Sequence, residues 1–408
     1  MDDKKLITNE EIDDGSNNIQ ERIQERILKK LDMTCPPDDE ELQALIMEEI
    51  RSFSENERIP LKEQIRLGRA LFHSFRKLDM LQELVEDKEI TEIMVNGPDS
   101  IFVEKHGKIT ELDKSFSGKN KLEDVVQQIA ASSNRIVNEY SPIVDARLPD
   151  GSRVNIVLPP IALNGPIITI RKFPEKPMTM EDLIRLNALD REIAEFLKKL
   201  VISKYNIFVS GGTGAGKTTF LNALSEFIPK DERIITIEDN AELQLLNKPN
   251  LVRLESRNQN TEGTGEISIR QLIKTALRMR PDRIIVGEVR SEEAIDMIQA
   301  MNTGHDGSLS TGHANSPEDM LTRLETMVLM GMELPLQAVQ KQLSSGIDII
   351  VHLGRMRDKS RKLFEIVEVG EAVDGKVRTK TLYRLEKGGF QKVGELENIQ
   401  KLEQAGFI

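Results

Sequence analysis

The residues best suited to chemistry form one glycine-rich segment. Its members are Gly211, Gly212, Thr213, Gly214, Ala215, Gly216, Lys217, Thr218 and Thr219. The segment has the spacing of a phosphate-binding loop, and it stands between a predicted strand at 207–210 and a predicted helix at 218–227. Glycines let successive amides face phosphate oxygens, Lys217 neutralises the β and γ phosphates, and the Thr218 hydroxyl is a magnesium ligand. We therefore predict a site for ATP and Mg²⁺; the flanking strand and helix disfavour a chance glycine turn.

A carboxylate follows a second apolar strand candidate. Residues 283–286 lead into Gly287 and Glu288, as a Walker B strand leads into its acidic residues. Many P-loop enzymes have an aspartate where this chain has Gly287, so Glu288 is left to orient or deprotonate the attacking water. The alternative is that Glu288 is a surface residue or an acidic helix-start residue near Ser291.

Another acidic pair, Glu238 and Asp239, closes the apolar strand candidate at 234–237. Ligands of open α/β folds bind at the carboxyl ends of the strands, so we expect this pair to face the nucleotide. Glu238 is a candidate for a catalytic role, and Asp239 for holding magnesium through water. A solvated turn is the alternative, because Glu-Asp-Asn is good turn composition.

Two of the five histidines, His305 and His313, flank the strand predicted at 308–311. They make an incomplete zinc site, because no cysteine is near and their spacing across a strand does not place them on one helical face. For His313 we predict a polar contact with the γ-phosphate. The alternative is an ordinary buried or surface histidine.

The elements that would position these residues alternate along 181–408. Strand candidates lie at 206–209, 234–237, 284–286, 308–311 and 347–351, with helical segments between them. Such alternation predicts a largely parallel sheet covered on both faces. The final stretch, 362–393, has short strand patterns separated by turns and predicts an antiparallel appendage.

Upstream, residues 81–172 are predicted to form a mixed α+β domain. Strand candidates lie at 93–95, 101–104, 109–112, 143–148, 154–158 and 167–172, with one helix at 122–131. Residues 173–180 contain Pro174 and Pro177 and have the composition of an interdomain linker.

The N-terminal part has two compositions. Apolar residues at helical spacing predict three amphipathic helices within 19–80, as a small bundle or an extended arm. Residues 1–18 are rich in acidic side chains and cannot bury enough apolar surface to offset their ordering entropy, so we predict a disordered tail.

Length, charge and cysteine content narrow the possible functions. A chain of 408 residues exceeds the size of a single hydrophobic core, so two or more domains are expected. The net charge of -12 counts against a nucleic-acid-binding protein, and most of it is concentrated in residues 1–60. The single cysteine, Cys35, cannot form an internal disulfide, and no long apolar run predicts a spanning helix. We expect a cytoplasmic protein without direct membrane insertion.

Four motifs together resemble the secretion and pilus-assembly ATPases of the type II and type IV systems. They occupy 211–219, 237–239, 286–290 and 301–317. Residues 302–308 and 323–328 are more closely similar to the CpaF-like ATPase of the Tad pilus system. The resemblance extends over about residues 80–370.

The resemblance implies a RecA-like P-loop domain preceded by the mixed α+β N-terminal domain and the helical arm. It implies a homohexamer that holds ATP and Mg²⁺ between the two domains. Hydrolysis would drive domain motion against an inner-membrane platform protein, with the motor peripheral at the inner face of the membrane.

The same resemblance assigns roles to single residues. Glu238 and Asp239 match the family's Asp box, Glu288 its Walker B glutamate, and His313 its His box. Arginines of the family's N-terminal domain reach the phosphates, and fitting strand positions here are held by Arg147, Arg153 and Arg171.

The chain departs from relatives at Gly312, where they tend to carry a bulkier residue, and it lacks the four-cysteine zinc insertion of many pilus-extension ATPases. We predict a motor for pilus assembly or protein secretion. A conjugation-type or archaellum-type ATPase has the same active site and stays open. A nucleic-acid translocase is disfavoured by the acidic balance and the lack of an aromatic-interleaved basic groove. Glu288 argues against a scaffold that binds ATP without hydrolysing it.

Overall fold

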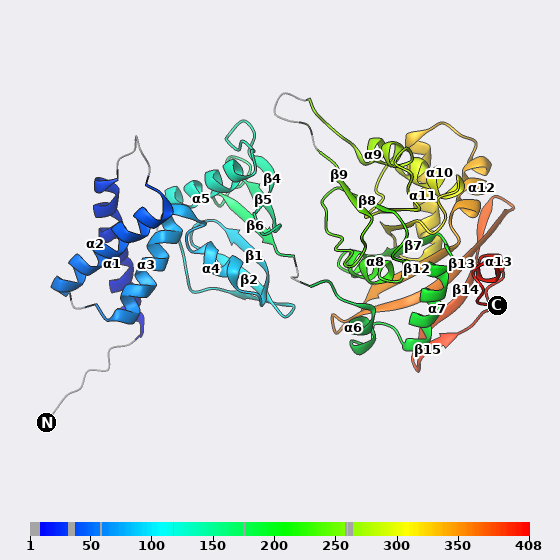
Figure 1. Ribbon diagram of the computed structural model, residues 1–408, viewed down its shortest axis with the longest axis horizontal. Helices are drawn as coiled ribbons and strands as arrows, with labels where there is room; N and C mark the ends of the chain where they lie inside the picture. Colours follow the sequence, from blue (N-terminus) through cyan, green and yellow to red (C-terminus); the bar gives the residue numbers. More distant parts are fainter. Residues whose placement is uncertain are drawn as a thin grey trace. The chain divides into compact units, whose positions relative to one another are not determined.

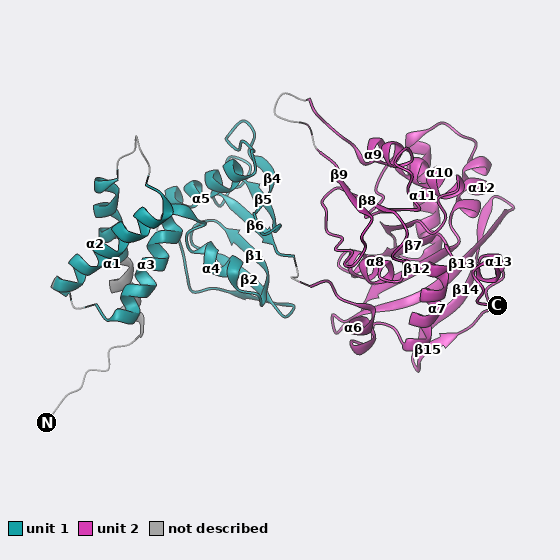
Figure 2. Ribbon diagram, in the orientation of Figure 1, with its two compact units in different colours: residues 1–174 teal, residues 175–408 magenta. Residues whose placement is uncertain are grey.

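The computed structural model describes residues 9–31, 37–57, 59–116, 118–173, 176–257, 259 and 264–408. The chain divides into two compact units, 1–174 and 175–408, and each is described by itself (Figure 2). This division falls inside the segment 173–180 that the sequence indicated as a linker. Cys35 and residues 1–8 of the predicted tail lie outside the described residues.

Unit 1 begins with a helical bundle made of α1 (Asn9–Lys30), α2 (Asp39–Glu57) and α3 (Leu61–Arg76). Their apolar faces share a core that includes Ile27, Ile46 and Leu71. The helix α1 begins at Asn9, so residues 9–18 are helical where the sequence predicted disorder. Extending an existing helix needs no new nucleation step. The amphipathic segment that starts at Ile19 provides the helix that residues 9–18 extend.

A six-stranded antiparallel sheet follows in unit 1 (Figure 1). Its order is β3-β2-β1-β6-β5-β4, with bounds β1 (Ile90–Asn96), β2 (Ile101–Lys105), β3 (Lys108–Glu111), β4 (Ile143–Arg147), β5 (Arg153–Val157) and β6 (Ile167–Arg171). The helices α4 (Leu81–Glu86) and α5 (Lys119–Ser132) accompany it. One face of the sheet packs on α5 through residues such as Ile156, Ile170 and Ile129. The mixed α+β character predicted for this region is confirmed.

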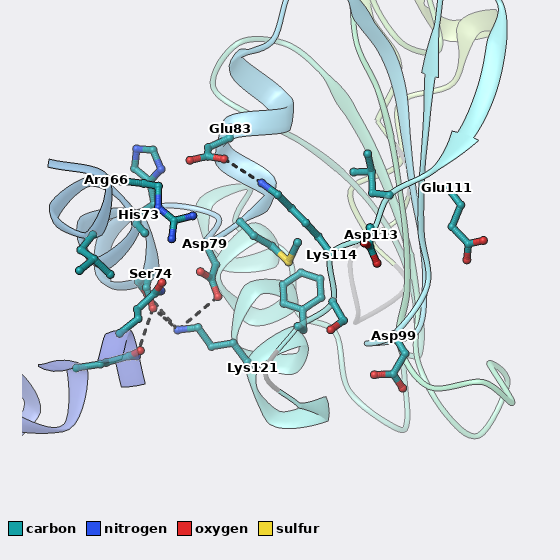
Figure 3. Close-up of a pocket in the computed structure, with 18 residues that line it drawn as sticks. Arg66, His73, Ser74, Asp79, Glu83, Asp99, Glu111, Asp113, Lys114 and Lys121 are labelled. Atoms are coloured by element: carbon teal, nitrogen blue, oxygen red, sulfur yellow. Dashed lines mark hydrogen bonds and ion pairs between the residues drawn. The ribbon is translucent and has the colours of Figure 1, made fainter. Parts of the chain in front are cut away.

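A cavity of about 990 Å³ lies within unit 1, with walls from α1, α3, α4, the loop after β3 and the start of α5 (Figure 3). Charges of opposite sign face each other there. Lys114 Nζ lies 3.3 Å from Glu83 Oε2, and Lys121 Nζ lies 3.9 Å from Asp79 Oδ2. Lys121 also donates a 2.7 Å hydrogen bond to Ser74 Oγ of α3. The contact of Lys121 therefore joins α3 of the bundle to α5, beside the separate cores of the bundle and the sheet.

Unit 2 contains a nine-stranded sheet with helices on both faces (Figure 1). The strands are β7 (Ile207–Gly211), β8 (Ile234–Glu238), β9 (Leu251–Glu255), β10 (Arg283–Val286), β11 (Leu309–His313), β12 (Ile349–Arg355), β13 (Arg361–Val373), β14 (Lys376–Glu386) and β15 (Gly389–Lys392). The helices are α6 (Met180–Arg185), α7 (Arg191–Ile202), α8 (Lys217–Ser225), α9 (Ile269–Ala276), α10 (Ala294–Asn302), α11 (Pro317–Gly331), α12 (Leu336–Gly346) and α13 (Gln400–Gln404).

The strand order is β15-β14-β13-β12-β7-β11-β10-β8-β9, parallel from β12 to β9 and antiparallel from β12 to β15. Side chains of β7 alternate between two cores. Ile207 and Val209 pack with α7 and α8, while Phe208 packs with residues of α9 to α12. Full burial of one such side chain contributes about 1.5–3 kcal/mol. The covered parallel sheet and the antiparallel appendage are both confirmed.

The sequence missed β9, whose residues are only half-buried or exposed. It pairs with β8 at the edge of the sheet, and such a strand needs no continuous apolar run. No helix in the described part of the chain combines the length and the apolar character needed to cross a membrane.

Candidate active site

The candidate residues of unit 2 lie at the carboxyl ends of four neighbouring parallel strands. The strand β7 ends at Gly211, β8 at Glu238 and β11 at His313. The strand β10 ends at Val286, and Gly287 and Glu288 follow directly. Because the order β7-β11-β10-β8 makes these strands adjacent, their ends meet at one edge of the sheet.

The glycine-rich segment forms the turn from β7 into α8. Gly214 and Gly216 have φ angles of 71° and 90°, a left-handed conformation that glycine adopts without a Cβ clash. Gly216 is the N-cap of α8, so Lys217, Thr218 and Thr219 form the first turn of that helix. Amides at the start of a helix have no intrahelical acceptor and carry partial positive charge. The turn therefore has the conformation and the donors that a phosphate group requires.

Lys217 is linked to Glu288 through His313. Lys217 is only 7% exposed, and its Nζ donates to the carbonyl oxygens of Gly211 at 3.2 Å and Gly212 at 3.1 Å. The same Nζ lies 3.2 Å from His313 Nδ1. On the other side of the imidazole, His313 Nε2 lies 2.9 Å from Glu288 Oε1.

The contact with Lys217 defines the tautomer of His313. An ammonium group only donates, so Nδ1 must be bare to accept from Lys217, and the neutral ring then carries its proton on Nε2. This assignment comes from the hydrogen-bond network. Burial lowers the pKa of His313, and Lys217 lowers it further against the opposing effect of Glu288. The imidazole therefore lies, in its neutral form, between the ammonium group of Lys217 and the carboxylate of Glu288.

Arg290 is a residue of the site that sequence reasoning named only as part of a motif. Its Nη2 donates to Glu288 Oε2 at 2.8 Å, and its Nη1 donates to Asp239 Oδ2 at 3.3 Å. Asp239 also accepts from Ser256 Oγ at 3.2 Å. The Oε2 oxygen of Glu288 is thus held by Arg290, while its Oε1 oxygen lies near His313 without a hydrogen-bond partner among the described residues. A basic residue two positions after a strand-end glutamate was the available signal.

Glu238 is buried beside the glycine that departs from the Walker B pattern. Its Oε2 accepts from the amides of Glu242 at 2.7 Å and Leu243 at 2.9 Å. Burial raises the pKa of Glu238 to about 6, and its Oε1 has no hydrogen-bond partner among the described residues. A Cβ on Gly287 would lie 2.8 Å from Glu238 Cγ. The side chain of Glu238 therefore occupies the space that an aspartate at position 287 would need.

The other departure, Gly312, also has a steric reason. A Cβ at this position would lie 2.9 Å from Met320 Sδ and 3.0 Å from Phe208 Cε1. A larger residue here would therefore have to displace the end of Met320 and crowd the ring of Phe208. The helix α11 starts just after His313, where Ser316 Oγ accepts from the amide of Asp319 at 3.0 Å. Strand and capped helix together fix the position of His313.

A magnesium ion would fit this site together with the nucleotide. Thr218 is the second residue of α8, and its hydroxyl is an oxygen ligand of the kind that Mg²⁺ prefers. In the described ranges no group of three or more His, Cys, Asp or Glu residues could hold a metal ion. Such an ion would therefore rely on Thr218, phosphate oxygens and waters, and Asp239 could contact one of those waters.

In unit 1, the three predicted arginines form a row across neighbouring strands. Arg147 of β4 is the direct partner of Arg153 of β5, and Arg153 is the direct partner of Arg171 of β6. Directly opposed residues share a face of the sheet. The neighbours Val154 and Ile170 point into the core, so the row lies on the opposite face. The three predicted arginines are therefore neighbours on one face of the sheet.

Comparison with known proteins agrees with this geometry. A family model described as Type II/IV secretion system protein matches residues 75–393. A putative conjugal transfer protein of Mycobacterium tuberculosis (strain CDC 1551 / Oshkosh) is 35% identical over 326 residues, which cover 78% of this chain and 92% of that protein. The type IV secretion system protein VirB11 of Bartonella henselae is 31% identical, with 72% of this chain and 91% of that protein covered.

Among solved structures, the Legionella pneumophila ATPase DotB is similar with a TM-score of 0.51 and 20% identity, covering 71% of this chain and 80% of that chain. This likeness concerns the fold, a RecA-like core with an N-terminal domain. The matched family model spans most of the chain, and close relatives extend over nearly their whole length. The chain therefore belongs to the type II/IV secretion system ATPase superfamily.

Proposed function

We propose that this chain hydrolyses ATP as a homohexameric motor of the CpaF-like type, which powers assembly of a Tad pilus or a related secretion process. Its partner would be an inner-membrane platform protein, which would hold the motor at the cytoplasmic face of the membrane. The observation that carries the proposal is that Lys217, His313 and Glu288 lie in close succession, 3.2 and 2.9 Å apart, directly beside the glycine-rich turn. A scaffold that only binds nucleotide would not need a carboxylate held in this way.

The residues divide the chemistry between them. The turn 211–216 and Lys217 would bind the β and γ phosphates, while Thr218 and waters would hold magnesium. Glu288 would orient the attacking water and take its proton. Arg290 holds Oε2 of Glu288 and leaves Oε1 without a hydrogen-bond partner among the described residues, so that Oε1 would be the oxygen that accepts from the attacking water. Bound ATP and Mg²⁺ supply the γ-phosphate and the charge that polarises it.

The arginine row of unit 1 is the proposed source of further positive charge. Phosphoryl transfer spreads negative charge over the γ-phosphate, and an arginine that contacts it raises turnover strongly. The row in β4, β5 and β6 presents three guanidinium groups on one face of a sheet. We propose that at least one of Arg147, Arg153 and Arg171 contacts the phosphates in the assembled hexamer.

A conjugation-type or other type IV secretion motor is the second candidate. It is favoured by the relatives, since one is named as a conjugal transfer protein and another as a type IV secretion component. The active sites are the same, so the distinction lies in the exported cargo. Deletion of the gene would abolish pili under the first proposal and plasmid or effector transfer under the second.

Phosphate release by the purified full chain tests the enzymatic part of the proposal. With ATP and Mg²⁺ we expect steady turnover that rises per chain as the protein concentration is increased, because the hexamer brings its parts together. Sedimentation over the same dilution series should show the hexamer forming in parallel. Absence of hydrolysis at any concentration would contradict an ATPase, and equal turnover by a dilute monomer would contradict the assembled motor.

A further inference from the structure

A second segment of unit 2 contacts the phosphate-binding turn, although it lies far away in the sequence. Arg361, the first residue of β13, donates from Nε to the carbonyl oxygen of Gly214 at 2.9 Å. Its Cδ lies 3.2 Å from the place where a Cβ of Gly216 would be. The exposed guanidinium therefore lies directly over the outer side of the turn.

The sheet places Arg361 there. The strand β12 runs parallel to β7, with Leu353 opposite Gly211, and then continues beyond the end of β7 to Arg355. The strand β13 returns antiparallel, so Arg361 is the direct partner of Arg355. The connection between β12 and β13 thus extends past the strand end from which the phosphate-binding turn begins.

The register of this hairpin is fixed by packing on one side and by hydrogen bonds on the other. A Cβ on Gly354 would lie 2.1 Å from the ring of Phe364, so only glycine allows that ring to cross β12. In the turn, the amide of Met356 donates to Ser360 O at 2.8 Å, and Asp358 Oδ1 accepts from the amide and hydroxyl of Ser360 at 2.9 and 2.6 Å. Arg361 is therefore held by an ordered hairpin.

The contact with Gly214 acts on the shape of the turn. When a carbonyl on the outer side is held by a donor, the peptide planes of the turn keep their amides available on the inner side, where phosphate oxygens bind. A turn that already has its binding conformation lowers the conformational entropy that is lost when phosphate binds. We propose that Arg361 is a positioning residue that pre-organises the phosphate-binding turn from outside the sequence motif; this rests on the proposed nucleotide site.

The competing explanation is that the hairpin only attracts the anionic nucleotide by its positive charge. Residues 354–362 are rich in basic side chains: Arg355, Arg357, Lys359, Arg361 and Lys362. Arg357 offers a matched control, since it is exposed on the same hairpin and has the same charge. If charge alone mattered, removal of Arg357 and removal of Arg361 would weaken anion binding alike. If the contact with Gly214 matters, the two substitutions would differ.

The test is titration of the full chain with fluorescent analogues of ADP and ATP. We expect Arg361→Ala to weaken both nucleotides by about tenfold, the scale of one hydrogen bond from a charged donor. Arg357→Ala should stay within about twofold of the wild type, and Arg361→Lys, which keeps a donor, should recover most of the loss. The difference should persist at high salt, where attraction between exposed charges is screened.

A second measurement follows the turn itself. Amide hydrogen exchange of the peptide containing residues 211–216 should become faster in Arg361→Ala and stay unchanged in Arg357→Ala. Equal affinity losses in the two variants, or a loss confined to ATP, would overturn the positioning role in favour of general charge or a direct γ-phosphate contact. Failure of the wild type to bind either nucleotide would instead sink the proposed function. A wild type that binds, beside an Arg361→Ala variant that binds equally well, would remove only the role of Arg361.

Discussion

The candidate phosphate-contacting residues of the two units are arranged in opposite ways. In unit 2, cations and anions alternate from Lys217 through Glu288 and Arg290 to Asp239, and His313 joins the first two. In unit 1, three arginines stand side by side with like charge. An alternating network holds its own geometry, whereas a row of arginines can offer several donors to one anion. We infer that nucleotide binding belongs to unit 2 and that the arginine row serves turnover.

The largest expected effect comes from the arginine row. Substitution of Arg147, Arg153 and Arg171 by alanine, one at a time, should reduce turnover by about three orders of magnitude for at least one of them. ATP affinity and nucleotide-dependent oligomerisation should survive, because the binding turn lies in unit 2. Steady-state phosphate release together with sedimentation measures both properties.

Arg135 is the control, as a partly exposed arginine of unit 1 outside the row. Arg135→Ala should leave turnover within about twofold of the wild type. The inference that unit 2 binds the nucleotide and that the arginine row serves turnover would be wrong in either of two cases. All three row variants could keep normal turnover, or they could lose ATP binding rather than turnover.

The next effect separates binding from chemistry inside unit 2. Glu288→Gln keeps the shape of the side chain but removes the base, so turnover should fall by about two or more orders of magnitude while ATP affinity is retained. Single-turnover assays and nucleotide titration on the same preparation measure the two quantities. Near-normal phosphate release would transfer the role to Glu238, the other carboxylate at this edge of the sheet.

The pH dependence of turnover tests the neutral state of His313. Burial keeps its pKa below the usual 6.5, so the ring stays neutral above that pH and charges only in more acidic solution. Protonated Nδ1 would face the Lys217 ammonium, so the contact between His313 and Lys217 would be lost. We expect kcat/KM to be flat between pH 6.5 and 8 and to fall below that range.

Glu238 also titrates in this region, at about pH 6, so a variant is needed to assign the acid limb. His313→Gln keeps a donor and an acceptor without a proton equilibrium. Its activity should be lower than that of the wild type, and its acid limb should move or disappear. An acid limb centred above pH 6.5 in the wild type, or an acid limb unchanged in the His313→Gln variant, would contradict the neutral state of His313.

The smallest effect is on stability. The pKa of Glu238 is about 6 in the folded protein against 4.5 for an ordinary glutamate. The folded state therefore binds the proton more tightly, and stability falls as the pH rises from 4.5 to 6. Glu238→Gln removes the ionisable group, and with it the free-energy cost of burying its negative charge. The variant should match the wild type near pH 4 and exceed its free energy of unfolding by about 2 kcal/mol at pH 7.

Urea unfolding at the two pH values measures the difference. The control is Glu255→Gln, which changes the exposed carboxylate opposite Glu238 in β9 and should alter stability by less than about 0.5 kcal/mol. A Glu238→Gln variant that is no more stable than the wild type at pH 7 would mean that the buried carboxylate is compensated by contacts other than those described.

The sequence was sufficient for the parts of this site that depend on local order. Buried parallel strands are continuous apolar runs, and the P-loop, Glu238, Glu288 and His313 stand directly at their ends. Strand neighbours follow from the fold class, so their convergence at one edge could be expected. The adjacency of the three arginines required the register of β4, β5 and β6, which periodicity does not contain.

Contacts between side chains from distant elements could not be predicted. The bridge by Arg290 depends on the spacing between the ends of β8 and β10, and the place of Glu238 depends on the missing side chain of Gly287. Arg361 reaches Gly214 across 147 residues of sequence. Such pairings leave no periodic signal, because they arise only when the sheet has brought its strand ends together.

The most direct test of the account is a side-by-side titration of the full-length variants Lys217→Ala and Arg153→Ala with a fluorescent ATP analogue. Under the proposed function Lys217 neutralises the phosphates, so its removal should weaken ATP binding by about two orders of magnitude or more, while circular dichroism shows an intact fold. Arg153→Ala should bind ATP within about threefold of the wild type. Unchanged affinity in a folded Lys217→Ala protein would contradict the central claim that the turn at 211–219 is the nucleotide site.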